Sequence, residues 1–351
     1  MDEPQSLIRV KVLSREPKGN WERQLPGPEA VWGRCKFLFD RDERDYDWLV
    51  VYDDLPPRAT ERRSLREEAL ACPRQHSLLV TSEPSSIKAY GKAYVSQFGC
   101  VLTSQEEWAL PHRDRIHSQP ALRWFYGIGS DHIVPYAELA AAAPPEKTRD
   151  LSMVWSGKKE RYTWHRQRYE FMRRIREALP DLGLYGRGVR HLDDKAEALD
   201  AYRYHIAIEN HVGLHHWTEK LSDPFLGFAL PFYHGCPNAE DYFPEHSFIR
   251  IDIADFDQAL ATIVQAIENR EYEKRLPYIV EARRRVLEEY NFMAVVSRAI
   301  EVRHTLPVAP DMGPGLLSSR YAIRRRQPLS VLRQVYEKAR SRLVFALRSR
   351  S

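Results

Sequence analysis

Short apolar runs alternate with charged, amphipathic stretches along the first third of the chain, which is the pattern of a parallel α/β domain. Four runs predict strands, at residues 7–13, 47–52, 78–81 and 100–103. The charged segment 58–71 and the segment 87–97, which follows a Ser/Glu/Pro turn, predict helices between them. The Ala/Pro-rich stretch 140–148 predicts a linker to a second domain.

A second series of the same kind follows that linker. Its apolar runs predict strands at residues 151–155, 183–185, 205–208 and 249–253, and a further strand at the start of 230–238. Its amphipathic stretches predict helices at residues 162–179, 256–267 and 272–290, with a polar turn at 156–159. The chain is thus expected to form two Rossmann-like α/β domains that face a cleft, residues 1–145 and 146–305, followed by a tail at 306–351.

The composition fits two domains of ordinary size. The chain has 351 residues, of which 43% are hydrophobic and 29% charged. No run approaches the roughly 20 apolar residues of a membrane span, and residues 1–5 do not begin a signal peptide. The four cysteines are scattered, which favours free thiols in a reducing compartment. We therefore expect a cytoplasmic protein.

Positive charge is concentrated in the tail. Residues 313–351 contain ten Lys and Arg and one acid, which is a net charge of +9. The whole chain carries +4, so the other residues carry −5. Apolar residues recur at helical spacing from residue 329 to residue 347, with arginines between them. A basic amphipathic helix suits an anionic membrane surface, and the alternative is a solvated helix that packs on the body. Nucleic acid is not expected as a partner, because the body is acidic.

Polar residues suited to binding or catalysis follow the apolar run at 205–208. Glu209 and Asn210 come directly after it, at the strand end where open α/β sheets bind ligands. Thr218 is a helix N-cap candidate that places Glu219 and Lys220 in the first turn. A lysine there opposes the helix dipole, which indicates a bound anion such as phosphate.

This order of motifs resembles the donor-binding region of glycosyltransferase family 10, the α-1,3-fucosyltransferases of bacterial type. The segments that carry the resemblance are residues 204–211, 217–221, 230–238 and 242–249. It covers about residues 150–255, with a weaker echo near 78–104. Two positions depart from the family pattern, since His211 stands where Ser is usual and His216 where Tyr is usual.

The resemblance implies a GT-B fold and inverting transfer of fucose from GDP-fucose to a glycan hydroxyl. Glu83, on the turn before Pro84, matches the general base that takes the proton of the acceptor hydroxyl. Arg166 matches the family's phosphate-binding arginine best, and Arg168 is the alternate. Glu209, Asn210, Thr218, Glu219 and Lys220 correspond to donor-binding positions. His216 is expected to donate to ribose or phosphate in place of the tyrosine.

No cofactor and no metal is expected. The chain has no Asp-x-Asp at a strand end, and its adjacent pairs, Asp53-Asp54 and Asp193-Asp194, are typical of turns. Cations and a helix dipole can stabilise a diphosphate leaving group instead. A metal cluster of His211, His215 and His216 is the weaker alternative, because no cysteine or carboxylate completes it.

Two alternatives stay open for the function as a whole. The same fold can use a different nucleotide-sugar, which the histidines at 211 and 216 favour. A non-catalytic, membrane-associated protein that binds sugar or nucleotide is the other, and the joint presence of Glu83, Glu219 and Lys220 speaks against it.

Overall fold

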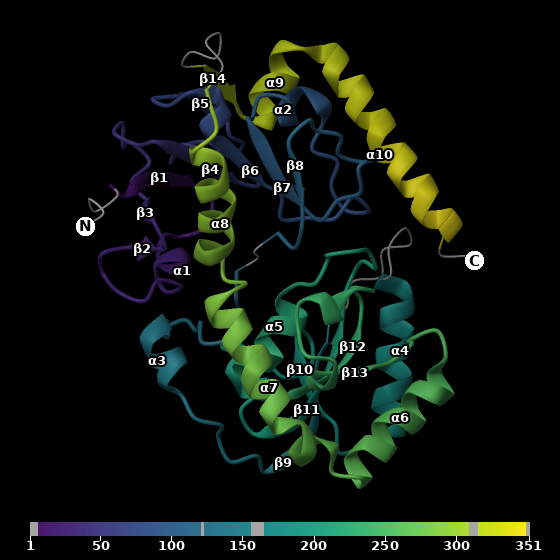
Figure 1. The fold of residues 1–351 in the computed structure, drawn as a ribbon. Coiled ribbons are helices and arrows are strands. Elements are labelled where there is room, and N and C mark those ends of the chain that lie inside the picture. The colour runs from purple at the N-terminus through teal and green to yellow at the C-terminus, as the bar shows by residue number, and fades with distance from the viewer. Residues whose placement is uncertain (1–5, 121–122, 156–164, 309–314, 349–351) are drawn as a thin grey trace. The chain divides into compact units, whose positions relative to one another are not determined.

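The computed structural model describes residues 6–120, 123–155, 165–308 and 315–348 (Figure 1). The chain forms two compact units, one of Met1–Ala121 with Phe292–Ser351 and one of Leu122–Asn291. Each unit is α/β and is built on a largely parallel sheet. The predicted fold class of two Rossmann-like α/β units is therefore confirmed.

The first unit is organised by a seven-stranded sheet in the order β2-β3-β1-β4-β6-β7-β8. Its strands are β1 (Ile8–Leu13), β2 (Val31–Trp32), β3 (Cys35–Leu38), β4 (Trp48–Tyr52), β6 (Ser77–Val80), β7 (Cys100–Thr103) and β8 (Arg115–His117). Neighbouring strands are parallel except β2 and β3. Every residue of β4, β6 and β7 is buried, which explains their unbroken apolar runs.

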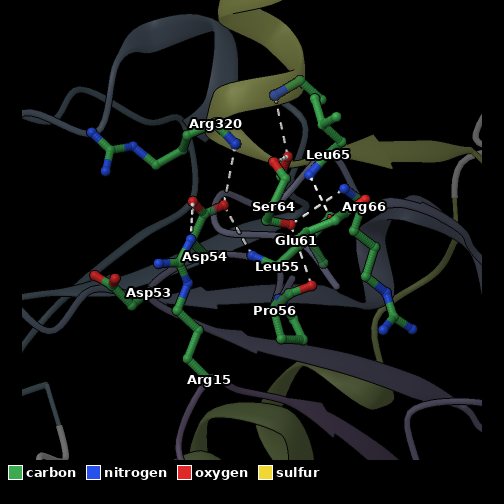
Figure 2. A network of polar contacts seen from close by, with 12 residues as sticks. Arg15, Asp53, Asp54, Leu55, Pro56, Glu61, Ser64, Leu65, Arg66 and Arg320 are labelled. Carbon is green, nitrogen blue, oxygen red and sulfur yellow. Dashed lines mark hydrogen bonds and ion pairs between the residues drawn. The ribbon is translucent and has the colours of Figure 1, made fainter. Parts of the chain in front are cut away.

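Short helices and the end of the chain complete this unit. The remaining elements are α1 (Gly19–Glu22), β5 (Glu67–Ala69), η1 (Arg74–His76), α2 (Lys92–Val95), α8 (Phe292–His304), β14 (Leu316–Ser318), α9 (Arg320–Arg326) and α10 (Pro328–Arg348). β14 pairs with β5 in an antiparallel ladder. Ser319 Oγ donates to the Ser64 carbonyl at 2.5 Å, and the Arg320 backbone N–H donates to Asp54 Oδ1 at 3.1 Å (Figure 2). These bonds fix the start of the tail to the unit.

The second unit is organised by a five-stranded sheet in the order β10-β9-β11-β12-β13, in which every pair is parallel. Its strands are β9 (Arg149–Trp155), β10 (Gly183–Gly186), β11 (Tyr202–Ile208), β12 (Leu230–His234) and β13 (Ile249–Arg250). Its helices are α3 (Tyr136–Ala141), α4 (His165–Ala178), η2 (Lys195–Ala198), α5 (Glu219–Leu226), η3 (Ala239–Asp241), η4 (Glu245–Ser247), α6 (Phe256–Glu268) and α7 (Glu271–Glu288). Figure 1 shows α4 and α6 on one side of this sheet and α5 and α7 on the other.

Three local predictions are wrong. Residues 58–71 form no helix, and their last part is β5, because Glu68 pairs with the buried Lys11 at 2.7 Å. The segment 87–97 is helical only in α2, which begins after Gly91, a residue at φ +88°. The stretch 140–148 is not a linker between the units, since the buried Lys147 Nζ donates to the carbonyls of Leu199 and Gly227.

The boundaries of the two units also differ from the expected ranges. The second unit begins at residue 122, before α3, and ends at residue 291. The chain then returns to the first unit through α8, and the tail belongs to that unit. The predicted turn at 156–159 and the start of the helix at 162–164 lie outside the described residues. Within the described parts of the chain, no helix is long and apolar enough to cross a bilayer.

Candidate active site

The polar residues at 209–220 gather at the carboxyl end of β11 in the second unit. The Glu209 N–H donates to the carbonyl of His234, the last residue of β12, at 2.8 Å. Both strands end there together, because Ile208 lies opposite His234 in the parallel ladder. The predicted position of Glu209 and Asn210 at a carboxyl strand end is thus confirmed.

Glu209 joins this strand end to the start of α5. Its side chain is fully buried and accepts from the Thr218 backbone N–H at 2.8 Å and from Thr218 Oγ1 at 2.7 Å. Thr218 is the N-cap of α5, since its Oγ1 accepts from the Lys220 N–H at 3.3 Å. Gly235 leaves the room for this carboxylate, because a Cβ there would lie 2.4 Å from Glu209 Cγ. The site is therefore fixed by packing as well as by hydrogen bonds.

Lys220 lies between two carboxylates. Its Nζ donates to Glu219 Oε1 at 2.8 Å and lies 3.7 Å from Glu209 Oε2. Burial lowers the pKa of Lys220, but Glu219 and Glu209 outweigh that effect and leave the pKa raised. Burial also acts against the charge of Glu219, yet Lys220 and Lys195 hold its pKa down at about 2. Both groups are therefore charged at neutral pH, and Lys220 Nζ also donates to Thr218 Oγ1 at 3.2 Å.

Arg168 reaches this cluster from α4, whereas Arg166 does not. Arg168 Nη1 donates to Asn210 Oδ1 at 2.7 Å, while Arg166 is exposed. Burial lowers the pKa of Arg168. Its Nε is also buried and has no acceptor among the residues that the structure describes. A half-buried guanidinium with an unused N–H is a suitable donor to a phosphate oxygen.

The helical spacing of α4 explains which arginine faces inward. Arg168 shares a helix face with Phe171, Met172 and Ile175, which lie three, four and seven residues further and are all buried. Arg166 lies off that face. This periodicity was present in the sequence and is the signal that distinguishes the two arginines.

Two of the three histidines lie against each other, and the third has other partners. His211 and His216 are buried and pack edge to face, with ring centroids 5.1 Å apart. Burial lowers the pKa of His216 far below its usual range, and the nearby His211 and Lys220 add to this, so His216 is neutral at pH 7. His215 Nδ1 instead contacts Tyr242 Oη at 2.5 Å. Across the described residues, no group of three or more His, Cys, Asp or Glu is arranged to hold a metal ion.

Lys195 and Asp223 belong to the cluster but were not predicted. Lys195 Nζ donates to Asp223 Oδ2 at 2.9 Å and to the Glu219 carbonyl at 3.1 Å. The Asp223 side chain is fully buried. With them the cluster contains three cations and three carboxylates. Lys195 comes from η2, which precedes β11 and lies outside the motif segments, so no local pattern indicated it.

Glu83 lies in the first unit, on the turn that follows β6. Its backbone is held on both sides, since its N–H donates to Tyr90 Oη at 3.3 Å and its carbonyl accepts from Gln105 Nε2 at 2.7 Å. Tyr90 Oη in turn donates to Asp53 Oδ1 at 2.5 Å. Asp53 is a turn residue at φ +69°, as predicted for the Asp53-Asp54 pair. The half-buried Glu83 side chain thus extends from a fixed backbone.

A cavity of about 710 Å³ opens at the same edge of that sheet. Its wall includes residues that follow the carboxyl ends of β1 and β3. The strands β3, β1, β4 and β6 are parallel, so their carboxyl ends lie at one edge of the sheet. The charged residues of the wall are Glu16, Lys18, Glu22, Asp40, Arg41 and Glu43. Mixed charges in a large cavity suit a ligand with many hydroxyl groups.

Comparison with known sequences identifies the region that contains the donor cluster. Residues 144–278 match the family described as glycosyltransferase family 10 (fucosyltransferase) C-term. This part of the chain is therefore similar to that family. The resemblance drawn from the motifs is confirmed. All the predicted donor-binding residues lie within residues 144–278.

Individual relatives are distant. Over 71 residues the chain is 31% identical to Alpha-(1,3)-fucosyltransferase FucT of Helicobacter pylori, a match that spans 20% of this chain and 15% of that protein. A crystal structure of alpha1,3-fucosyltransferase with GDP-fucose is similar at 15% identity and a TM-score of 0.44, over 79% of this chain and 83% of that one. The pneumococcal O-GlcNAc transferase GtfA with UDP and GlcNAc is similar at 11% identity and a TM-score of 0.40, over 73% and 56%.

Proposed function

We propose that the protein is an inverting glycosyltransferase that moves fucose from GDP-fucose to a glycan hydroxyl, with α-1,3 linkage. The observation that carries the proposal is the hydrogen-bonded cluster of Arg168, Asn210, Glu209, Thr218 and Lys220 inside the region that matches family 10. Guanidinium and ammonium groups and the N–H groups of a helix start all bind diphosphates. Here all three lie at the carboxyl end of one strand.

The donor-binding roles divide by chemistry. Arg168 and Lys220 hold the diphosphate and stabilise the negative charge that develops on it as the glycosidic bond breaks. Glu219 and Asn210 hydrogen-bond to hydroxyls of ribose or fucose, while the fully buried Glu209 positions Thr218 and Lys220. The neutral His216 donates one ring N–H. The cations supply the stabilisation that a divalent metal gives elsewhere, so the reaction is metal-independent in this proposal.

The first unit supplies the acceptor side of the reaction. Glu83 acts as general base: it takes the proton of the acceptor hydroxyl while that oxygen attacks the anomeric carbon opposite the diphosphate. One displacement therefore inverts the anomeric configuration. The 710 Å³ cavity at the carboxyl ends of β1 and β3 is the acceptor glycan's candidate site.

The proposal is tested by product analysis. The protein is incubated with GDP-fucose, a panel of glycans and excess chelator, and GDP release and the anomeric configuration of the product are measured by NMR. We expect an α-fucoside from the β-linked donor. A product from UDP-sugars alone would instead establish the second candidate donor class, which His211 and His216 beside Lys220 favour. Activity that chelation abolishes and manganese restores would refute metal independence.

We also propose that α10 binds an anionic membrane surface. It exposes Leu332, Val335, Tyr336 and Leu343, each more than 60% accessible, and also exposes Arg333, Lys338 and Arg340. Apolar side chains enter the interface while the cations meet lipid phosphates. Co-sedimentation with vesicles, for the whole chain and for a form that ends at Met312, is the test. We expect the whole chain alone to bind, and only at low salt. Equal partition of the two forms would leave α10 as a packing helix.

A further inference from the structure

A cavity of about 380 Å³ lies in the first unit, remote in sequence from the region that matches family 10. It is enclosed by the turn at residues 87–89, by α9 and by α10. Its volume falls within the range of roughly 300–1,000 Å³ that is usual for small-molecule sites. The lining residues are Ile87, Lys88, Ala89, Arg320, Arg324, Gln334, Val335 and Lys338. Four of these carry positive charge and none is acidic.

The neighbouring carboxylates neutralise only part of this charge. Lys88 is paired with Asp53. Asp54 lies near Arg320, but it accepts from the backbone N–H of that residue, and Figure 2 shows the Arg320 guanidinium pointing away from Asp54. Glu337 pairs with Arg333 outside this lining. Arg320, Arg324 and Lys338 therefore contribute an excess of positive charge to the cavity.

The guanidinium groups are held in place before any ligand arrives. Arg320 donates through Nε to the Tyr90 carbonyl at 3.2 Å, and also to the Ala89 carbonyl. Arg324 Nε donates to Gln334 Oε1 at 2.6 Å, and Gln334 Nε2 donates to the Ala89 carbonyl at 3.0 Å. Burial lowers the pKa of Arg324, and the charge of Arg320 lowers it further. Fixed like charges at one cavity favour an anion between them.

We propose that this cavity is a binding site for a phosphoryl group, separate from the nucleotide-sugar site. The guanidinium groups of Arg320 and Arg324 suit phosphate oxygens because each has several N–H donors in one plane. Lys338 closes the site from α10. Val335, beside it on the same helix, is exposed and offers an apolar contact to the remainder of the ligand. The phosphoryl group belongs either to a lipid headgroup or to a soluble phosphate.

The test is titration of the whole protein with two soluble probes, dihexanoyl-phosphatidylglycerol below its micelle concentration and inorganic pyrophosphate. The variant is Lys338→Gln, because Lys338 is exposed and Arg324→Gln would also remove the bond that docks Gln334. Arg325→Gln is the matched control, since Arg325 is exposed on α9 outside the lining. Lys338→Gln should weaken binding about five-fold, which corresponds to ~1 kcal/mol for a basic residue at a phosphate, and Arg325→Gln should not.

The titrations decide whether the site exists and which kind of phosphoryl group it binds. Binding of the lipid alone identifies a headgroup as the source, and equal binding of pyrophosphate identifies a soluble phosphate. Both support the site, provided that Lys338→Gln weakens the binding and Arg325→Gln does not. Failure of both probes to bind, or equal loss in the two variants, overturns it. GDP titration of Lys338→Gln should be unchanged, so this inference stands or falls independently of the proposed fucosyl transfer.

Discussion

The two arginines at the start of α4 provide a paired test of the donor site. Arg166→Gln and Arg168→Gln remove the same charge two residues apart on one helix. Only Arg168 is half-buried and donates to Asn210, so we expect only its loss to weaken GDP binding. A charged hydrogen bond contributes about 1.5–3 kcal/mol, which corresponds to roughly a 10- to 150-fold weaker Kd. Arg166→Gln should stay within about two-fold, because an exposed charge is screened.

Stability separates this effect from a folding defect. Burial of the Arg168 guanidinium already disfavours its charged form, so glutamine at 168 should cost less than about 2 kcal/mol of unfolding free energy. Calorimetric titration with GDP and urea unfolding of the same samples measure both quantities. The reasoning is refuted if Arg166→Gln weakens GDP binding as much as Arg168→Gln, or if Arg168→Gln binds GDP normally.

Three further outcomes are expected. Glu83→Gln should leave GDP affinity unchanged and reduce kcat by roughly 10²–10⁴-fold, the usual range for loss of a positioned base, and near-normal turnover at saturating acceptor would exclude Glu83. Tyr90→Phe removes the hydroxyl that accepts from the Glu83 N–H, so kcat should fall while the KM for the donor stays unchanged. If Tyr90→Phe lowers kcat by the same factor in the Glu83→Gln background, Tyr90 has a merely structural role. The pKa of Glu219 falls from 4.5 unfolded to about 2 folded, so its stabilisation is present above pH 4.5 and is lost as pH falls toward 2. Burial raises the pKa of Glu209, which opposes this loss, and Glu219→Gln should flatten the pH dependence of chemical unfolding between pH 5 and 3.

The sequence predicted the parts of the fold that are decided locally. The apolar runs of β1, β4, β6 and β7 appear as largely buried strands, and the Thr218 N-cap lies where the motif indicated. These features depend on a few neighbouring residues. The donor cluster was predictable for the same reason, because most of it lies within one strand, one loop and one helix start.

Elements that depend on distant partners were missed. β5 exists because β14, about 250 residues further along the chain, pairs with it, and no local pattern indicates that contact. Residues 58–71 are charged and have helical composition, but the buried ion pair of Lys11 with Glu68 outweighs that propensity. Lys195 entered the site in the same way, through a contact with Asp223 that only the folded sheet creates.

The central claim is that the region matching family 10 binds a guanine nucleotide-sugar through cations without a metal. Calorimetric titration of the whole protein with GDP and with UDP, in excess chelator, tests it most directly. We expect GDP to bind at least ten-fold more tightly than UDP, a difference of about 1.4 kcal/mol, with no change when magnesium is added. Equal affinity for the two nucleotides, or binding that appears only with a divalent ion, would contradict the account.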